Sequence, residues 1–184
     1  MKKETKSFNS EVEYQVEYRS VKYPRLEFRT GSLVLILPEK YEGEDKLIYN
    51  HKKWILKKHR SIKSALQASK KKKLNNLSIP DLKKFIITYI KSNSKLAKPK
   101  KVLFKAMKSK WGSCNTSKTL TFNTLLRYLP PSLIKYIVYH EMIHLKEKKH
   151  NNHFWRLVSK KFKNYKSKEK DLFIYWFLVQ EKIR

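Results

Sequence analysis

The stretch "VYHEMIHLKEKKHNNHFW", residues 138–155, contains four of the six histidines in this chain of 184 residues. Two of them, His140 and His144, stand four residues apart around Glu141 in the order H-E-x-x-H. On a helix, side chains four residues apart lie on one face, so both imidazoles can bind the same metal ion. The glutamate lies beside them, where it can take a proton from a water on that metal. The pattern therefore predicts a metal-binding helix with its own general base.

The nitrogen donors predict zinc as the metal. Zn²⁺ favours imidazole ligands, has no redox chemistry and lowers the pKa of a bound water towards ~7. Catalytic zinc commonly has three protein ligands, and His150 and His153 follow directly. We predict His150 as the third ligand, because a residue in the expected turn has more freedom to reach back than one inside the next helix. His153 is the alternative ligand, and histidines with ordinary core or surface partners are the alternative to a metal site.

Helical patterns surround these histidines. The stretch "LPPSLIKYIVYHEMIHLKEKK", residues 129–149, predicts a helix that begins near Pro131 and ends within its last five residues. That end carries Lys146, Lys148 and Lys149, and positive charge is favourable at a helix C-terminus.

Two more helices are expected after the histidines. Residues 151–165 predict one helix, with Asn151 or Asn152 as its N-cap. Residues 168–184 predict a last helix that is apolar nearly all round its middle, so we expect it to pack against the body of the protein. We interpret the aromatic pair Phe154-Trp155 as core packing rather than as substrate contacts.

The first part of the chain predicts strands followed by helices. Residues 11–40 alternate apolar and polar side chains, with Thr30-Gly31-Ser32 as a hairpin turn between two strands. The spacing then becomes helical, because Ile48, Ile55 and Ile62 follow one another at intervals of two helical turns.

A second helix and a short sheet are expected next. The helix begins near Ser78 and has Pro80 in its first turn. The segments "KVLFKAMKSKWGSC" and "KTLTFNTLL" predict two strands joined by the turn "NTSK". The order of these elements indicates an α+β fold: an N-terminal hairpin or sheet, helices, a short sheet and then the metal-binding helix.

The net charge of +29 fits a surface for nucleic acid or another polyanion. Only seven of the 44 basic residues are arginine, however, and arginine is the residue that makes bidentate contacts to bases and phosphates. We therefore favour a lysine-biased surface, and nucleic acid as a partner is the alternative.

The chain also lacks sequence signals for export or membrane insertion. Its one cysteine, Cys114, allows no internal disulfide and fits a reducing compartment. Residues 1–14 are basic but have no apolar segment of the kind found in signal peptides. The longest apolar run, residues 172–179, is too short to span a bilayer. We expect a cytoplasmic protein without a membrane span; the sequence does not give its oligomeric state.

The histidine motif and a second motif, W-G-S-C at residues 111–114, together resemble those of the YgjP-like metallopeptidases. These are a family of zinc-dependent hydrolases related in their core to SprT-like proteases. The family motif reads H-E-x-x-H, five residues, H, three residues, Phe-Trp, and residues 140–155 match it in turn. Trp111-Gly112-Ser113-Cys114 matches the family's W-G-S-C, and "YLPPSLIKYIVYHE" and "KKWILKK" are similar to other family segments. The likeness covers about residues 15–160. The five-residue gap also matches metzincins, but Glu147 stands where those proteins carry glycine.

The resemblance implies a zincin-like fold in which His140, His144 and His150 hold zinc and Glu141 is the general base. We expect one domain over residues 1–184. Its parts are a β-rich segment at about 11–40, a catalytic core at about 102–165 and a C-terminal helix at about 168–184.

In zincins, a strand beside the metal helix binds the peptide substrate as an additional strand. Trp111, Gly112, Ser113 and Cys114 are the candidate substrate-binding residues, because a glycine allows close approach of the backbone. The alternative is a tight bend with Trp111 in the core.

The expected function is that of a zinc-dependent metallopeptidase acting on a peptide or protein. One alternative is a metal-dependent hydrolase of a non-peptide amide or ester, since the same water chemistry serves both. The other is a basic nucleic-acid-associated protein, either a protease linked to DNA or a binding module with structural zinc. Glu141 argues against structural zinc, because a closed site needs four ligands and has no use for an adjacent glutamate.

Overall fold

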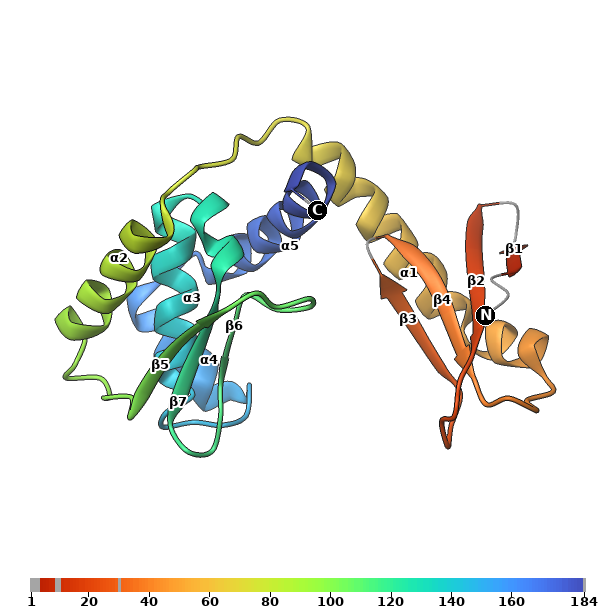
Figure 1. The fold of residues 1–184 in the computed structure, drawn as a ribbon, viewed down its shortest axis with the longest axis horizontal. Helices are drawn as coiled ribbons and strands as arrows, with labels where there is room; N and C mark the ends of the chain where they lie inside the picture. Colours follow the sequence, from red (N-terminus) through yellow and green to blue (C-terminus); the bar gives the residue numbers. More distant parts are fainter. Residues whose placement is uncertain (1–3, 9–10, 30, 184) are drawn as a thin grey trace. The chain divides into compact units, whose positions relative to one another are not determined.

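The structure is a computed structural model that describes residues 4–8, 11–29 and 31–183 (Figure 1). The chain divides into two compact units, residues 1–71 and 72–184. The domain expected over the whole chain therefore contains two separate hydrophobic cores, one in each unit. None of the described helices is both long and apolar enough to cross a bilayer.

The first unit contains a four-stranded sheet. Its strands are β1 (Glu4–Phe8), β2 (Val12–Tyr18), β3 (Arg25–Arg29) and β4 (Ser32–Leu37), in the order β1-β2-β4-β3. The predicted hairpin is confirmed, because β3 and β4 pair antiparallel, although its turn residue Thr30 lies outside the described residues. The pairing of β2 with β4 is parallel, and the sequence did not predict it or β1.

Helix α1 (Glu44–Ser69) crosses one face of this sheet (Figure 1). Its predicted stripe is confirmed, because Ile48, Ile55 and Ile62 are all buried. Ile48 and Ile55 pack with the leucines of β4, which alternate along that strand and so share one face. The seven-residue spacing of apolar side chains therefore determines which face of α1 meets the sheet.

A buried carboxylate lies on the face of β2 opposite the side chains that pack with α1. Glu17 is 7% exposed and accepts hydrogen bonds from Arg29 (Nη1 to Oε2, 3.1 Å) and from Arg19. Burial alone would raise the pKa of Glu17, but the hydrogen bonds and charges of Arg29 and Arg19 outweigh it and lower this pKa. Because the folded-state pKa is depressed, the ionised Glu17 stabilises the fold above its unfolded-state pKa, and this contribution is lost as the pH falls.

We therefore predict that Glu17→Gln lowers the stability of the first unit at pH 7 by about 1–3 kcal/mol, because two arginines lose their charged partner. The difference from wild type should shrink as the pH falls through the acid range, where Glu17 itself becomes protonated. Hydrogen exchange of peptides from β2 and β4, monitored as a function of urea concentration, measures the stability of this unit separately. Glu13→Gln, which neutralises an exposed carboxylate on the same strand, is the control and should change little. An equal loss for both variants would contradict the prediction.

Four helices belong to the second unit: α2 (Ile79–Ser92), α3 (Pro131–Ile143), α4 (Asn152–Lys161) and α5 (Tyr165–Ile183). Two N-caps follow from the sequence, since Ser78 accepts from the Asp81 N–H and Asn151 accepts from the Phe154 N–H. Of the two predicted caps for α4, Asn151 is the one used. Helix α5 begins at Tyr165, earlier than the expected residue 168.

Helix α3 ends earlier than predicted. Its last helical residue is Ile143, and His144 is the C-cap, so the lysines of "LKEKK" lie beyond the helix instead of in its last turn. The His144 ring bonds to the carbonyl oxygen of Glu147 (Nδ1 to O, 2.9 Å), which stabilises the reversal of the chain after the helix. The segment that leads to α4 is therefore non-helical from its start.

The second sheet corrects the prediction of one strand over "KVLFKAMKSKWGSC". This segment forms two strands, β5 (Lys101–Lys105) and β6 (Gly112–Cys114), and both pair with β7 (Thr119–Asn123) in the order β5-β7-β6. A 3₁₀ helix, η1 (Thr124–Tyr128), follows β7. Because β5 is parallel and β6 antiparallel to β7, the chain must reverse between them.

Asn123 holds the loop that makes this reversal. Its side chain is fully buried and donates to the carbonyl oxygens of Met107 and Lys110, both at 2.8 Å. Its backbone N–H donates to the Trp111 carbonyl oxygen at 2.8 Å. Buried backbone groups need hydrogen-bond partners. Here the Asn123 side chain provides the donors that a neighbouring strand would provide in a sheet. The start of β6 is fixed by these bonds.

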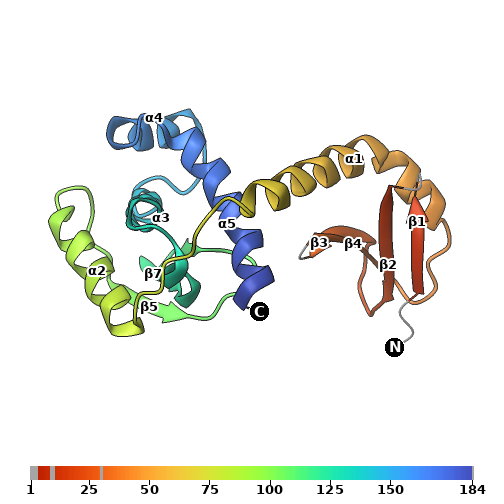
Figure 2. The same cartoon turned by 90° about the horizontal axis from the view of Figure 1, so that it is seen from above.

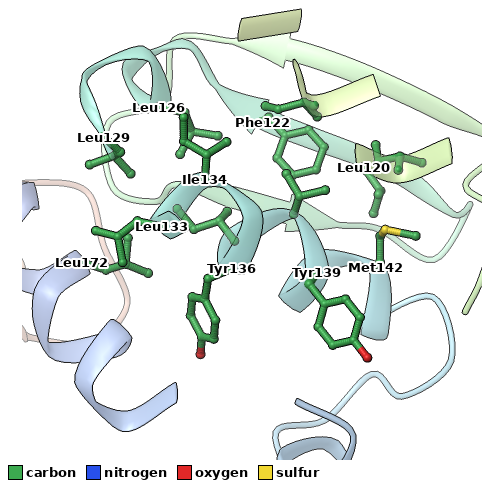
Figure 3. Close-up of a cluster of buried hydrophobic side chains, with 14 of the residues drawn as sticks. Leu120, Phe122, Leu126, Leu129, Leu133, Ile134, Tyr136, Tyr139, Met142 and Leu172 are labelled. Atoms are coloured by element: carbon green, nitrogen blue, oxygen red, sulfur yellow. The ribbon is translucent and has the colours of Figure 1, made fainter. Parts of the chain in front are cut away.

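Helix α3 lies between this sheet and α4, with α2 and α5 on either side (Figure 2). Leu120 and Phe122 of β7 belong to the same buried cluster as Ile134 and Met142 of α3 (Figure 3). The metal-motif helix is thus the central element of the second unit. The predicted α+β class, with a short sheet followed by the H-E-x-x-H helix, is confirmed.

Candidate active site

Three histidines converge at the C-terminal end of α3. His140 and His144 come from adjacent turns, and His150 comes from the segment between α3 and α4. The Nε2 atom of His150 lies 2.9 Å from Nε2 of His140 and 3.0 Å from Nε2 of His144. His153 is exposed on α4, with its Nδ1 atom 3.0 Å from Arg156, and is not part of this group. Of the two candidates for a third ligand, the chain brings His150 to the pair.

A buried phenylalanine supports all three imidazoles. The Phe154 ring is fully buried, and its centroid lies 4.6–4.9 Å from the centroids of His140, His144 and His150. Trp155 stacks on His150 at 5.6 Å. Phe154 and Trp155 are packing residues, as interpreted from the sequence, and among the groups that they pack against are the imidazoles themselves.

Burial favours the neutral form of His140 and His144. Desolvation, together with the neighbouring His144 and His150, lowers the pKa of His140 to about 3, and burial also lowers the pKa of His144. The Nδ1 atom of His144 faces a carbonyl oxygen of Glu147, which can only accept, so the ring proton sits on Nδ1. Its Nε2 atom therefore points a lone pair at the other two histidines.

Glu141 lies beside the histidines and against the start of β6. It is 7% exposed, and burial raises the pKa of its carboxyl to about 7, against the opposing charge of Lys110. A Cβ atom at Gly112 would lie 2.8 Å from Cγ and 2.9 Å from Oε1 of Glu141. The glycine of W-G-S-C thus leaves room for the side chain of Glu141, and the close approach to a substrate that the sequence suggested stays a prediction.

These groups line a cavity of about 460 Å³, a size that suits a small-molecule or peptide side-chain site. All four predicted substrate-binding residues, Trp111 to Cys114, are in its lining. β6 forms one wall, and within the described residues it pairs only with β7, which leaves its other edge without a strand partner. The Trp111 indole N–H donates to the Leu172 carbonyl oxygen (3.4 Å) and its ring meets Trp176 at 4.9 Å, so this residue also packs against α5.

Sequence reasoning missed several residues of this cavity. Lys110 and Lys148 line it, as do Tyr136 of α3 and Glu169 and Leu172 of α5. The lysines are indistinguishable in sequence from many others in this chain. Glu169 follows His144 by 25 residues and belongs to no motif, so only the packing of α5 reveals that it lies at the cavity.

The comparisons with known proteins agree with this geometry. The model of the YgjP-like metallopeptidase domain matches residues 63–173, which is more than half of the chain. The chain belongs to this family. It is therefore a metallopeptidase, and a peptide or protein is its substrate. A search of curated proteins found no match.

Solved structures with some similarity include two metallopeptidase zymogens. Abylysin from Pyrococcus abyssi is 24% identical, with a TM-score of 0.43, over 54% of this chain and 96% of that one. Jannalysin from Methanocaldococcus jannaschii is 25% identical, with a TM-score of 0.42, over 53% of this chain and 97% of that one.

The family implies a metal cofactor, and the residues of this YgjP-like metallopeptidase fit one. Tetrahedral bonds of ~2.0–2.1 Å place two ligand nitrogens about 3.3 Å apart. The Nε2 separations of 2.9 and 3.0 Å are close to that value. At these separations the Nε2 atoms of the three imidazoles would repel one another unless a proton or an ion lay between them. The donor set therefore suits a metal that prefers nitrogen.

We predict that Gly112→Ala displaces the Glu141 carboxylate and abolishes most peptidase activity while the protein retains its metal. The added methyl would overlap Cγ and Oε1 of Glu141, which are its nearest neighbours and belong to the proposed base, not to a metal ligand. Metal content per chain, the thermal midpoint and the rate of peptide cleavage should be measured together. A variant that cleaves peptides at the wild-type rate would show that the close contact is not needed.

Proposed function

We propose that this chain is a zinc-dependent peptidase of the H-E-x-x-H type. His140, His144 and His150 hold the ion, and Glu141 is the general base. The observation that supports this most directly is the convergence of three Nε2 atoms beside a buried carboxylate. When bound, zinc supplies Lewis acidity, which makes a water more acidic and polarises the carbonyl group of the substrate.

Glu141 provides the proton transfers in this proposal. Its carboxylate accepts a proton from the water that attacks the peptide carbonyl and then delivers it to the nitrogen of the leaving amine. The backbone of Gly112 lies close against the side chain of Glu141, which limits the positions that the carboxylate can take. A base held in this way loses little entropy when the reaction begins.

The free edge of β6 is the proposed substrate site. An extended peptide that pairs with Gly112–Cys114 would lie across the cavity that contains the histidines and Glu141. Backbone pairing of this kind places a peptide bond near the base without requiring a particular side chain. A non-peptide amide or ester lacks the strand backbone that this edge would recognise, which favours a peptide.

Glu141→Gln tests the base. The amide has the same shape but cannot accept a proton, so we expect turnover to fall about 10²–10⁴-fold while zinc content stays near one ion per chain. Glu181→Gln, an exposed glutamate at the end of α5, is the control and should behave as wild type. Unchanged turnover in Glu141→Gln would remove this residue from the mechanism.

His150→Ala and His153→Ala together test the ligand assignment. We expect His150→Ala to lose tightly bound zinc, since only two imidazoles remain, and His153→Ala to keep it. Zinc per chain is measured after dialysis against a mild chelator, with circular dichroism to confirm folding. If His153→Ala loses the ion and His150→Ala does not, the assignment is reversed. If neither variant loses zinc, the third ligand lies elsewhere.

A further inference from the structure

We infer that Glu169 of α5 is a positioning residue of the metal centre: it faces the far nitrogen of His140 and holds that ring with Nε2 directed at the ion. This inference rests on the proposed function, because it assumes that His140 is a ligand. It also gives the C-terminal helix a role, although that helix carries none of the motif residues.

The geometry of the His140 ring separates its two nitrogens. Nε2 lies 2.9 Å from Nε2 of His150, within the group of histidines. Nδ1, on the opposite side of the ring, lies 3.8 Å from Oε1 of Glu169. This distance exceeds a hydrogen bond, so the contact in the structure is electrostatic. A carboxylate there favours the tautomer with its proton on Nδ1, which leaves the Nε2 lone pair free for a metal.

His144 shows the same arrangement with a different acceptor. Its Nδ1 atom faces the Glu147 carbonyl oxygen at 2.9 Å, while its Nε2 atom faces His150. Thus the Nδ1 atoms of His140 and His144 each face an oxygen atom, on the side of the ring away from Nε2. Metal-binding histidines are commonly oriented by a carboxylate or carbonyl on their second nitrogen, and loss of that partner costs 10–100-fold in metal affinity.

The Glu169 carboxylate is itself held in place. The hydroxyl of Tyr136 donates to Oε1 of Glu169 at 2.5 Å, and this oxygen is the one that faces His140. Tyr136 is 1% exposed and precedes His140 by one helical turn, so it lies on the same face of α3. Trp111 bonds to the Leu172 carbonyl oxygen one turn further along α5, which fixes the helix next to the site.

Two other roles for Glu169 fit less well. As a fourth ligand it would have to reach the Nε2 side of the imidazoles, whereas its oxygen faces Nδ1 of His140. A purely structural link between α3 and α5 through Tyr136 would explain the hydrogen bond but not why the same oxygen faces the histidine. The experiment must therefore separate an effect on the metal from an effect on the fold.

The test compares Glu169→Gln with Asp171→Asn in the full-length protein. Both remove one negative charge from the first half of α5, but Asp171 pairs with Lys72 (2.8 Å) and does not line the cavity. Zinc affinity is measured by competition with a chromophoric chelator, and thermal midpoints measure stability. We expect Glu169→Gln to bind zinc about 10–100-fold more weakly, Asp171→Asn to bind it as wild type does, and Glu169→Asp to restore part of the loss. Equal affinity in wild type and Glu169→Gln, or an equal loss in both charge variants, overturns the inference.

A second measurement needs no metal. Long-range ¹H–¹⁵N correlation spectra of the metal-free protein report the tautomer of the His140 ring. We expect a proton on Nδ1 in wild type and a mixture of tautomers in Glu169→Gln; the same tautomer in both would overturn the inference. His140→Ala distinguishes the two proposals, because wild-type zinc affinity in that variant refutes the assigned ligand set itself, whatever Glu169 does.

Discussion

The approach of the His150 Nε2 atom to about 3 Å from the Nε2 atoms of both His140 and His144 is the constraint on which the second unit depends. It requires a helix that presents two histidines on one face and then stops, so that the chain can return with the third. The stop occurs at Ile143, and the ring of His144 itself bonds to the returning backbone at Glu147. One residue therefore contributes both to the site and to the turn that completes it.

The position of Glu141, the proposed base, depends on a separate set of bonds in the sheet. Asn123 holds the loop before β6, and β6 presents Gly112 to the Glu141 carboxylate. A buried asparagine whose side chain makes four hydrogen bonds is costly to replace, because any substitute leaves carbonyl oxygens of the loop without donors. The position of the glutamate is thus set from two directions, by α3 through its backbone and by β7 through Asn123.

Local signals in the sequence were sufficient for much of this architecture. The capping residues Ser78 and Asn151, the isoleucine stripe of α1 and the helical spacing of His140 and His144 all act over a few residues, so a pattern reveals them. The division of "KVLFKAMKSKWGSC" into two strands could not be read in this way, because it depends on Asn123, which lies beyond both strands in sequence. The parallel pairing of β2 with β4 and the approach of Glu169 to His140 are likewise tertiary, and no spacing rule connects their members.

The high positive charge of the chain bears on the role of the carboxylates that line the cavity. A net charge of +29 opposes the binding of a cation, but charges in solvent are screened beyond about 10 Å, so the groups nearest the site dominate. Those groups are Lys110 and Lys148 on one hand and Glu141 and Glu169 on the other, and all four line the same cavity. Glu169, and Glu141 in its ionised form, oppose the charges of the two lysines at the point where a metal would bind. On the proposed assignment, the Glu169 carboxylate behind His140 is the negative charge that α5 brings to the site, so the packing of α5 contributes to the chemistry of α3.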